Sequence, residues 1–160
     1  MNFRIGFGYD VHRLEAGIPL YLGGVNIPHN KGAAGHSDAD VLIHALCDAI
    51  LGAAAKGDIG QHFPDSDKKY HNIDSTILLK ECLNIVKTDG YNIGNIDTTI
   101  ALQEPKIGPL IPEMRAKLAR VMDIEIDQIS IKATTEEKLG FTGREEGVAA
   151  YAVVLLKLDH

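Results

Sequence analysis

Two side chains near the start of the chain, Asp10 and His12, could do chemistry together. They fall in the stretch from Arg4 to Val11, which is rich in apolar, aromatic and glycine residues and is typical of a β-strand. Residues i and i+2 of a strand point to the same face of a sheet, so this carboxylate and this imidazole should lie side by side. The pair could be two ligands of one metal ion, an acid–base couple or a surface ion pair.

A third candidate ligand, His44, lies in the middle of the apolar segment "DVLIHALCDA", which favours a helix. A lone histidine in such a position is usually a core residue. A helix that follows a β-hairpin packs on its sheet, however, so His44 can meet the face that carries Asp10 and His12. Two imidazoles and one carboxylate are typical of a three-ligand zinc site with an open fourth position. Asp48, one helical turn further on, is a candidate hydrogen-bond partner for the His44 ring.

Two polar loops carry residues that suit a phosphorylated ligand. His36 and Ser37 precede a helix, where free N–H groups and the helix dipole favour anions, and both side chains can donate hydrogen bonds to a phosphate. The loop "GDIGQHFPD" offers carboxylates for sugar hydroxyls and glycine for a close approach of the ligand. Its candidate residues are Asp58, Gly60, Phe63 and Asp65. Taken alone, its aspartates are more typical of turns and helix caps than of a ligand site.

A third group of candidates follows an expected strand, in the segment "KATTEEKLGFTGREEG". Thr134 and Thr135 offer hydroxyl groups, and Glu137 offers a carboxylate beside a candidate phosphate site, which is how Mg²⁺ is usually held. A charged hairpin loop would have a similar composition. The sequence contains no Walker A, GxSxG or HExxH pattern, and nothing in it supports a Ser-His-Asp triad.

The elements that must position these residues follow from the hydrophobic pattern. Strands are expected at 4–11, 18–28, 95–105, 128–135 and 148–158. Helices are expected at 41–55, 76–90 and 111–122. The second strand is interrupted by Gly23 and Gly24. The order β-β-α-α-β-α-β-β predicts an α/β (α+β) fold, with a single mixed β-sheet and helices packed on one face. No repeat or linker is visible, so residues 1–160 are expected to form a single domain.

Composition and charge narrow the class of protein. The 160 residues are 45% hydrophobic and 24% charged, which is typical of a soluble globular domain with a sizeable core. A net charge of −6 argues against nucleic-acid binding, and the apolar run "VAAYAVVLL" is too short to cross a membrane. Cys47 and Cys82 lack CxxC spacing and are expected to be buried in a protein of a reducing compartment. With no signal peptide visible, we expect a cytoplasmic protein without nucleic-acid or membrane partners.

Several segments, taken as a set, resemble the 2-C-methyl-D-erythritol 2,4-cyclodiphosphate synthase family. They are "GYDVHRL", "GHSDADVLIHALCDA", "GDIGQHFPD", "QEPKI", "IPEMRAKLA" and "IKATTEEKLGFTGREEG", and they follow the family's order over nearly the whole chain. The resemblance implies an enzyme of the non-mevalonate isoprenoid pathway. Its substrate would be 4-diphosphocytidyl-2-C-methyl-D-erythritol 2-phosphate, converted to the cyclic 2,4-diphosphate with release of CMP. The resemblance also implies a homotrimer with active sites between neighbouring subunits.

The resemblance further implies a role for each candidate residue. The implied metal ligands are Asp10, His12 and His44 for Zn²⁺ and Glu137 for Mg²⁺ or Mn²⁺. His36 and Thr135 would stabilise the transition state. The implied substrate-binding residues are Ser37, Asp58, Gly60, Phe63, Asp65, Leu102, Pro105, Lys106, Ile107, Gly108, Thr134, Phe141 and Arg144.

Two other functions fit the same residues. A zinc-dependent phosphodiesterase would use a metal-bound hydroxide to hydrolyse a nucleotide diphosphate, and it would release a linear product. A non-catalytic trimer that binds isoprenoid diphosphates would bind its ligand without turnover. The products of an incubation with the substrate distinguish the three functions.

Overall fold

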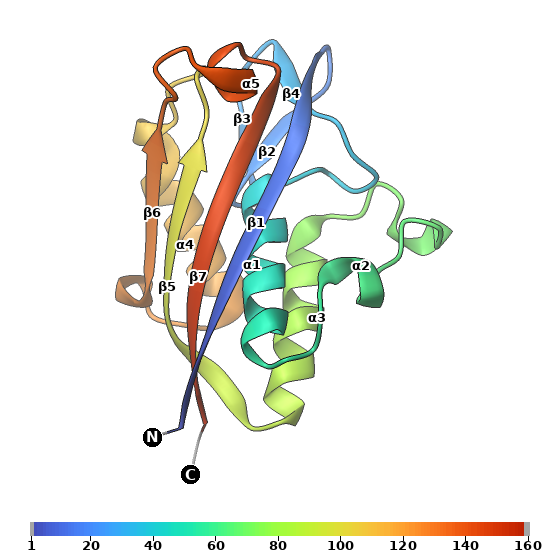
Figure 1. Ribbon diagram of the computed structural model, residues 1–160, viewed down its shortest axis with the longest axis vertical. Helices are drawn as coiled ribbons and strands as arrows, with labels where there is room; N and C mark the ends of the chain where they lie inside the picture. Colours follow the sequence, from blue (N-terminus) through green and yellow to red (C-terminus); the bar gives the residue numbers. More distant parts are fainter. Residues whose placement is uncertain (1, 159–160) are drawn as a thin grey trace.

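A computed structural model describes residues 2–158 and shows a mixed β-sheet with helices packed on one face (Figure 1). Five strands form this sheet in the order β4-β1-β7-β5-β6. Their bounds are β1 (Phe3–Ala16), β4 (Lys31–Ala33), β5 (Tyr91–Ala101), β6 (Ile129–Thr134) and β7 (Gly147–Leu158). β5 and β6 run parallel, and the other neighbouring pairs are antiparallel. The predicted fold class is confirmed.

Three helices of more than two turns cover the sheet. They are α1 (Val41–Ala53), α3 (Ser75–Thr88) and α4 (Ile111–Met122). Shorter helical segments lie in regions that the sequence pattern assigns to loops. They are α2 (Ile59–His62), α5 (Gly140–Gly143), η1 (Lys68–Tyr70), η2 (Gly108–Leu110) and η3 (Ile126–Gln128). The three long helices match the predicted ones closely, because each has an apolar face and a recognisable start, such as Asp74 at the N-cap of α3.

The prediction of a single strand at 18–28 is wrong. This segment forms an antiparallel hairpin, β2 (Leu20–Leu22) and β3 (Val25–Ile27), which is a separate two-stranded sheet. Gly23 and Gly24 have φ angles of 59° and 74°, and two successive residues with positive φ reverse the chain direction in a tight hairpin turn. β4, which pairs with β1, lies in a segment expected to be a loop.

α1 is the centre of the core. Apart from Asp48 and Gly52, all its residues are buried, because it is enclosed by the sheet, by α3 and by the β2–β3 hairpin. Asp40 caps α1 by accepting a hydrogen bond from the Ile43 amide at 3.1 Å. The same carboxylate accepts hydrogen bonds from the amides of Gly23 and Gly24 at 3.0 and 2.7 Å. One buried side chain therefore fixes both the start of α1 and the hairpin turn.

Glycines let α1 lie very close to β1. A Cβ atom added at Gly8 would stand 1.8 Å from the Ala45 carbonyl oxygen, and one added at Gly6 would stand 1.8 Å from that of Ala49. Both distances are far below van der Waals contact, so no side chain fits at either position. The contact between β1 and α1 is thus a backbone-to-backbone approach that depends on glycine.

The other face of the sheet is apolar and exposed. It carries Phe3, Ile5, Phe7, Tyr9 and Val11 of β1 and Tyr151 and Val153 of β7, with exposed fractions from 38% to 73%. Tyr9 and Tyr151 pair across the strands, with ring centroids 5.2 Å apart. The three long helices, α1, α3 and α4, pack on the opposite face and leave this one uncovered (Figure 1). A continuous apolar surface of this kind is typical of an interaction site. In the same part of the chain, no helix is long and apolar enough to cross a membrane.

The glycine contact can be tested with a pair of substitutions. Gly8→Ala should lower the free energy of unfolding by about 2 kcal/mol or more, because the added methyl group forces α1 away from β1. Gly52 lies in α1 and has open space around its Cβ position. Gly52→Ala should therefore raise the free energy of unfolding by up to about 1 kcal/mol. Urea unfolding followed by circular dichroism measures both changes. Equal stability of the Gly8→Ala variant and the parent protein would contradict the proposed tight contact.

Candidate metal centre

The structure brings the three predicted metal ligands together. Asp10 and His12 lie on the helix-facing side of β1, and His44 lies in α1, which packs on that side. The Nε2 atom of His12 is 2.9 Å from Asp10 Oδ2 and 3.1 Å from His44 Nδ1. His44 Nδ1 is 3.2 Å from Asp10 Oδ2. Three potential ligand atoms therefore face a common point, and the three residues form a candidate metal-binding cluster.

In each imidazole, the nitrogen that faces away from the cluster is within hydrogen-bonding distance of a nearby oxygen atom. His12 Nδ1 is 3.0 Å from the carbonyl oxygen of Ala34, which can only accept, so Nδ1 carries a proton. Its Nε2 atom is then the one that faces the cluster. His44 Nε2 is 3.0 Å from the hydroxyl oxygens of both Ser37 and Ser75. Two oriented imidazoles and one carboxylate are a donor set that fits zinc.

Asp48 is not the hydrogen-bond partner of His44, contrary to the expectation from sequence. Its Oδ1 atom accepts a hydrogen bond from the Ile59 amide at 2.9 Å and so ties the start of α2 to α1. The partners of His44 instead come from the loop before α1 and from the start of α3. Helical spacing alone does not reveal them, because Ser75 is separated from His44 by 31 residues.

Burial and polar contacts shift the pKa values of Asp10 and His12 in opposite directions. Burial by itself would raise the pKa of the Asp10 carboxyl, but its close polar contacts with the imidazoles of His12 and His44 outweigh burial and lower the pKa to about 2. Burial would lower the pKa of His12, but its hydrogen bond to Asp10 raises that pKa above the usual value of 6.5. Asp10 is therefore ionised at neutral pH, and a metal ion that binds here competes with a proton on His12.

The metal cluster lines a cavity of about 340 Å³. Other predicted site residues line it too: His36, Ser37, Gly60, Phe63 and Asp65. His36 and Asp65 are both exposed, with Nε2 and Oδ2 3.9 Å apart. Asp58 does not line the cavity but caps α2, accepting a hydrogen bond from the Gln61 amide at 3.1 Å. The cavity thus joins the metal cluster to the two loops predicted to bind phosphate and sugar groups.

Sequence reasoning missed four apolar or aromatic residues of the same cavity. These are Ile59, Tyr70, Ile73 and Leu78. Three of them lie in the loop segments and short helices between α1 and α3, where no periodic pattern marks a side chain as part of a site. Phe63 and Tyr70 contact each other edge to face, with ring centroids 5.4 Å apart, which gives the cavity an aromatic wall.

The remaining predicted site residues form a second cluster at the ends of β5 and β6. The Leu102 amide donates to the Thr134 carbonyl oxygen at 3.0 Å, and the Lys138 amide donates to Gln103 Oε1 at 3.1 Å. We use the name second cluster for the segments 102–108 and 134–138, which follow β5 and end or follow β6. Its residues Pro105, Lys106, Gly108, Thr135 and Glu137 do not line the metal cavity. Leu102 and Ile107 point into the core, so only their backbone groups are available to a ligand.

Phe141 and Arg144 lie near this second cluster, in and just after α5. Phe141 lines a small cavity of about 210 Å³ with Val11 and Glu146. Arg144 Nε donates to Glu146 Oε1 at 2.9 Å, and both side chains are exposed.

The metal cluster and Thr134 of the second cluster lie on opposite faces of the sheet. Val11 pairs with Ala149, Ala149 with Ala101, and Ala101 with Thr134, so Thr134 is level with Val11. Three inter-strand spacings separate the two residues by roughly 14 Å. Along β6, Ile129 and Ile131 are buried against the helices. The alternate residues Lys132 and Thr134 are exposed on the opposite face of the sheet, which α1, α3 and α4 leave uncovered. Asp10 and His12 face the helices instead.

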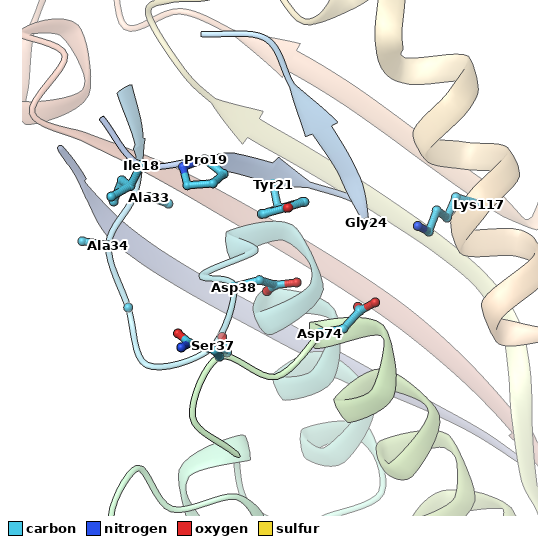
Figure 2. A pocket seen from close by; sticks show the side chains of 12 residues that line it. Ile18, Pro19, Tyr21, Gly24, Ala33, Ala34, Ser37, Asp38, Asp74 and Lys117 are labelled. Carbon is cyan, nitrogen blue, oxygen red and sulfur yellow. The ribbon is translucent and has the colours of Figure 1, made fainter. Parts of the chain in front are cut away.

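A larger cavity, of about 540 Å³, shares Gly35 and Ser37 with the metal cavity. Figure 2 shows Ser37 and Asp38 on the loop that leads into α1 and Asp74 at the start of α3, with Tyr21 and Lys117 around the same space. The segment 34–38 is therefore a wall common to both cavities, and its residues also contact both histidines of the metal cluster.

Known proteins are similar to this chain in sequence and fold. The YgbB family matches residues 3–157. A relative from Porphyromonas gingivalis, named 2-C-methyl-D-erythritol 2,4-cyclodiphosphate synthase, is 63% identical over 154 residues, which are 96% of this chain and 95% of the relative. A solved structure of the bifunctional IspDF from Campylobacter jejuni has a TM-score of 0.95 at 44% identity. The match covers 98% of this chain and 42% of that one. A CDP-bound structure of 2C-methyl-D-erythritol-2,4-cyclodiphosphate synthase has a TM-score of 0.90 at 41% identity, covering 96% of this chain and 100% of that one.

Metal binding at the cluster should depend on pH through His12. Because hydrogen bonding to Asp10 raises the pKa of His12, protons should compete with the metal ion at pH values above 6.5 as well as below. With zinc as the probe, affinity should fall as the pH is lowered through that pKa, by roughly tenfold per pH unit below it. Competition with a chromophoric chelator between pH 5.5 and 8.5 measures this. His71→Ala, which removes an exposed histidine outside the cavity, is the control and should leave the curve unchanged. A pH-independent affinity would contradict zinc binding through His12.

Proposed function

Because the chain belongs to the YgbB family, we propose that it catalyses the reaction for which its relatives are named, as a 2-C-methyl-D-erythritol 2,4-cyclodiphosphate synthase. It converts 4-diphosphocytidyl-2-C-methyl-D-erythritol 2-phosphate to the cyclic 2,4-diphosphate and releases CMP. The observation that carries this function is the Asp10–His12–His44 cluster in the wall of a cavity that also presents His36 and Ser37. A metal cluster next to phosphate-binding groups suits a reaction at phosphorus.

The nucleophile in this reaction belongs to the substrate. An oxygen of the 2-phosphate attacks the β-phosphorus of the substrate's own diphosphate, a new P–O bond closes the ring, and the bond to the CMP oxygen breaks. No serine or cysteine nucleophile is needed, so the protein has to position two phosphates and stabilise charge. Bound at the cluster, Zn²⁺ would supply a Lewis acid for a phosphate oxygen.

The chain's own residues carry the rest of the mechanism. His36 and Ser37, at the cavity, donate hydrogen bonds to phosphate oxygens of the substrate. Asp58 and Gly60 bind the sugar, and Phe63 and Asp65 lie on the same loop. From the second cluster, Thr135 stabilises the transition state. The remaining substrate contacts come from Leu102, Pro105, Lys106, Ile107, Gly108, Thr134, Phe141 and Arg144.

Glu137 is proposed to hold the second metal ion, Mg²⁺ or Mn²⁺. Its carboxylate is exposed and follows the two threonine hydroxyl groups at the end of β6. Glu137 also has a φ angle of 52°, so the chain turns two residues after Thr135. A diphosphate held by these hydroxyl groups would complete the oxygen ligands that Mg²⁺ prefers.

We propose that three copies of the chain assemble so that each active site lies between two subunits. This assembly is supported by the placement of the metal cluster and Thr134 on opposite faces of the sheet within one chain. Packing of the apolar sheet faces of neighbouring chains would bury Phe7, Tyr9 and Tyr151. The same packing would bring the second cluster of one chain towards the metal cavity of the next.

Residues 1–160 are proposed to act as a single synthase domain in the cytoplasm. Both cysteines of the chain, Cys47 and Cys82, are free and buried, as their surroundings in the sequence predict. Free cysteines suit a reducing compartment.

The products of one incubation test the function. With substrate, zinc and Mg²⁺, the protein should release one CMP per cyclic diphosphate formed, as measured by ³¹P NMR and chromatography. Glu137→Gln should weaken the dependence on Mg²⁺ while leaving bound zinc in place. A linear phosphorylated product would favour a phosphodiesterase, and binding without turnover would favour a non-catalytic protein; either result overturns the proposal.

The shared active site can be tested by mixing variants. His44→Ala and Thr135→Ala should each be nearly inactive alone. If a site takes His44 from one subunit and Thr135 from its neighbour, mixed trimers contain some sites with both residues intact, and refolding the variants together should restore part of the activity. Mixed trimers isolated with two different affinity tags provide the sample. Mixing without any recovery would contradict the shared site, and a monomer in sedimentation would contradict the trimer.

A further inference from the structure

Ser75 has no part in the mechanism above, yet it lies directly behind the metal cluster. It is the first residue of α3 and is fully buried. Its hydroxyl oxygen is 3.0 Å from His44 Nε2, on the side of the ring away from Asp10 and His12. The same hydroxyl group donates a hydrogen bond to Asp38 Oδ1. Asp38, Ser75 and His44 therefore form a continuous chain of contacts that joins a loop, α3 and α1.

Asp38 is oriented so that it can only accept. Its Oδ1 atom accepts a hydrogen bond from the Asp40 amide at 3.2 Å, and its Oδ2 atom accepts one from the Ser75 amide at 3.0 Å. With backbone donors on both oxygens, the carboxylate takes the hydroxyl hydrogen of Ser75 as well. The lone pairs that Ser75 turns towards His44 can then only accept a hydrogen bond.

This orientation decides which nitrogen of His44 carries the proton. Because Ser75 accepts, His44 Nε2 must be the donor, and His44 Nδ1 is left with a free lone pair. Nδ1 is the atom that faces Asp10 Oδ2 and His12 Nε2. The lone pair is therefore aimed at the position that a metal ion would take.

Ser37 also lies 3.0 Å from His44 Nε2, but its situation differs. It is in a loop, lines the metal cavity and accepts a hydrogen bond from the Ala39 amide at 3.1 Å. No carboxylate within residues 2–158 holds its hydroxyl hydrogen. Figure 2 shows Ser37 next to Asp38 on this loop. With Ser75 as the fixed acceptor for His44, the hydrogen of Ser37 can point into the cavity towards a phosphate oxygen.

We propose that Ser75, aligned by Asp38, is a positioning residue that holds His44 in the tautomer and orientation that bind the metal ion. The inference rests on the metal site of the proposed function. It adds a division of labour between the two serines: Ser75 serves the metal site, and Ser37 serves the substrate.

Metal affinity tests this role without any activity measurement. Ser75→Ala should weaken zinc binding by about 10- to 100-fold in competition with a chromophoric chelator, the usual effect of losing such a partner. Thr76→Val is the matched control. Thr76 is the next residue and is also buried, and its hydroxyl bonds only to Asp74, at 2.7 Å, so the variant perturbs the same helix start without touching His44. Ser37→Ala should weaken zinc binding less than Ser75→Ala does.

A spectroscopic measurement on the zinc-loaded parent protein needs no variant. The Nε2–H proton of His44 should give an NMR signal that exchanges slowly with water, because it is donated to a buried hydroxyl. In Ser75→Ala this proton should exchange faster, and in Thr76→Val it should not. Zinc affinity unchanged by Ser75→Ala, an equal loss in Thr76→Val, or an unprotonated Nε2 in the parent protein would each overturn the proposal. Failure of the synthase assay with these results intact would overturn only the proposed reaction.

Discussion

The close approach of α1 to β1 is the constraint on which the metal cluster depends. Along the helix-facing side of β1 stand Gly6, Gly8, Asp10 and His12, and opposite the two glycines stand Ala49 and Ala45 of α1. Two residues of strand advance about 6.7 Å and four residues of helix about 6.0 Å, so the two elements stay nearly in register. His44 lies one residue before Ala45, beside this line of contact, and its Nδ1 atom reaches Asp10 Oδ2 at 3.2 Å. With a larger residue at Gly8, the imidazole would be held further from its partners.

Two aspartates that precede α1 complete the arrangement that this contact begins. Asp40 fixes the first turn of α1 and the β2–β3 turn with one carboxylate, and Asp38, two residues earlier, fixes the start of α3. Both act through backbone amides, so their positions are set by the path of the chain and not by flexible side-chain pairs. The metal cluster is thus built on the starts of two helices and the middle of one strand, which are rigid parts of the fold.

The sequence reveals those parts of the site that obey a local rule. Strand alternation puts Asp10 and His12 on one face, and the apolar surroundings of His44 predict a buried helix, so the ligand set could be anticipated. The partners of His44 could not. Ser75 has the composition of a helix start, and nothing local shows that its hydroxyl group reaches across to α1. The hairpin at Gly23–Gly24 resembles one interrupted strand in sequence because its turn lies within an apolar run. That Thr134 and Asp10 lie on opposite faces depends on the order β1-β7-β5-β6, which no local pattern contains.

The sheet therefore separates the two sets of chemical groups that the proposed reaction needs, and this separation gives the apolar face its significance. A face with Phe7, Tyr9 and Tyr151 exposed is unfavourable for an isolated chain in water, and a neighbouring chain removes that cost by covering it. In the proposed trimer, the contact that buries these side chains is also the contact that completes the site. Assembly and catalysis would then rest on opposite faces of the same strand, β1: the odd-numbered side chains bind the neighbour, and the even-numbered ones, Asp10 and His12, bind the metal ion.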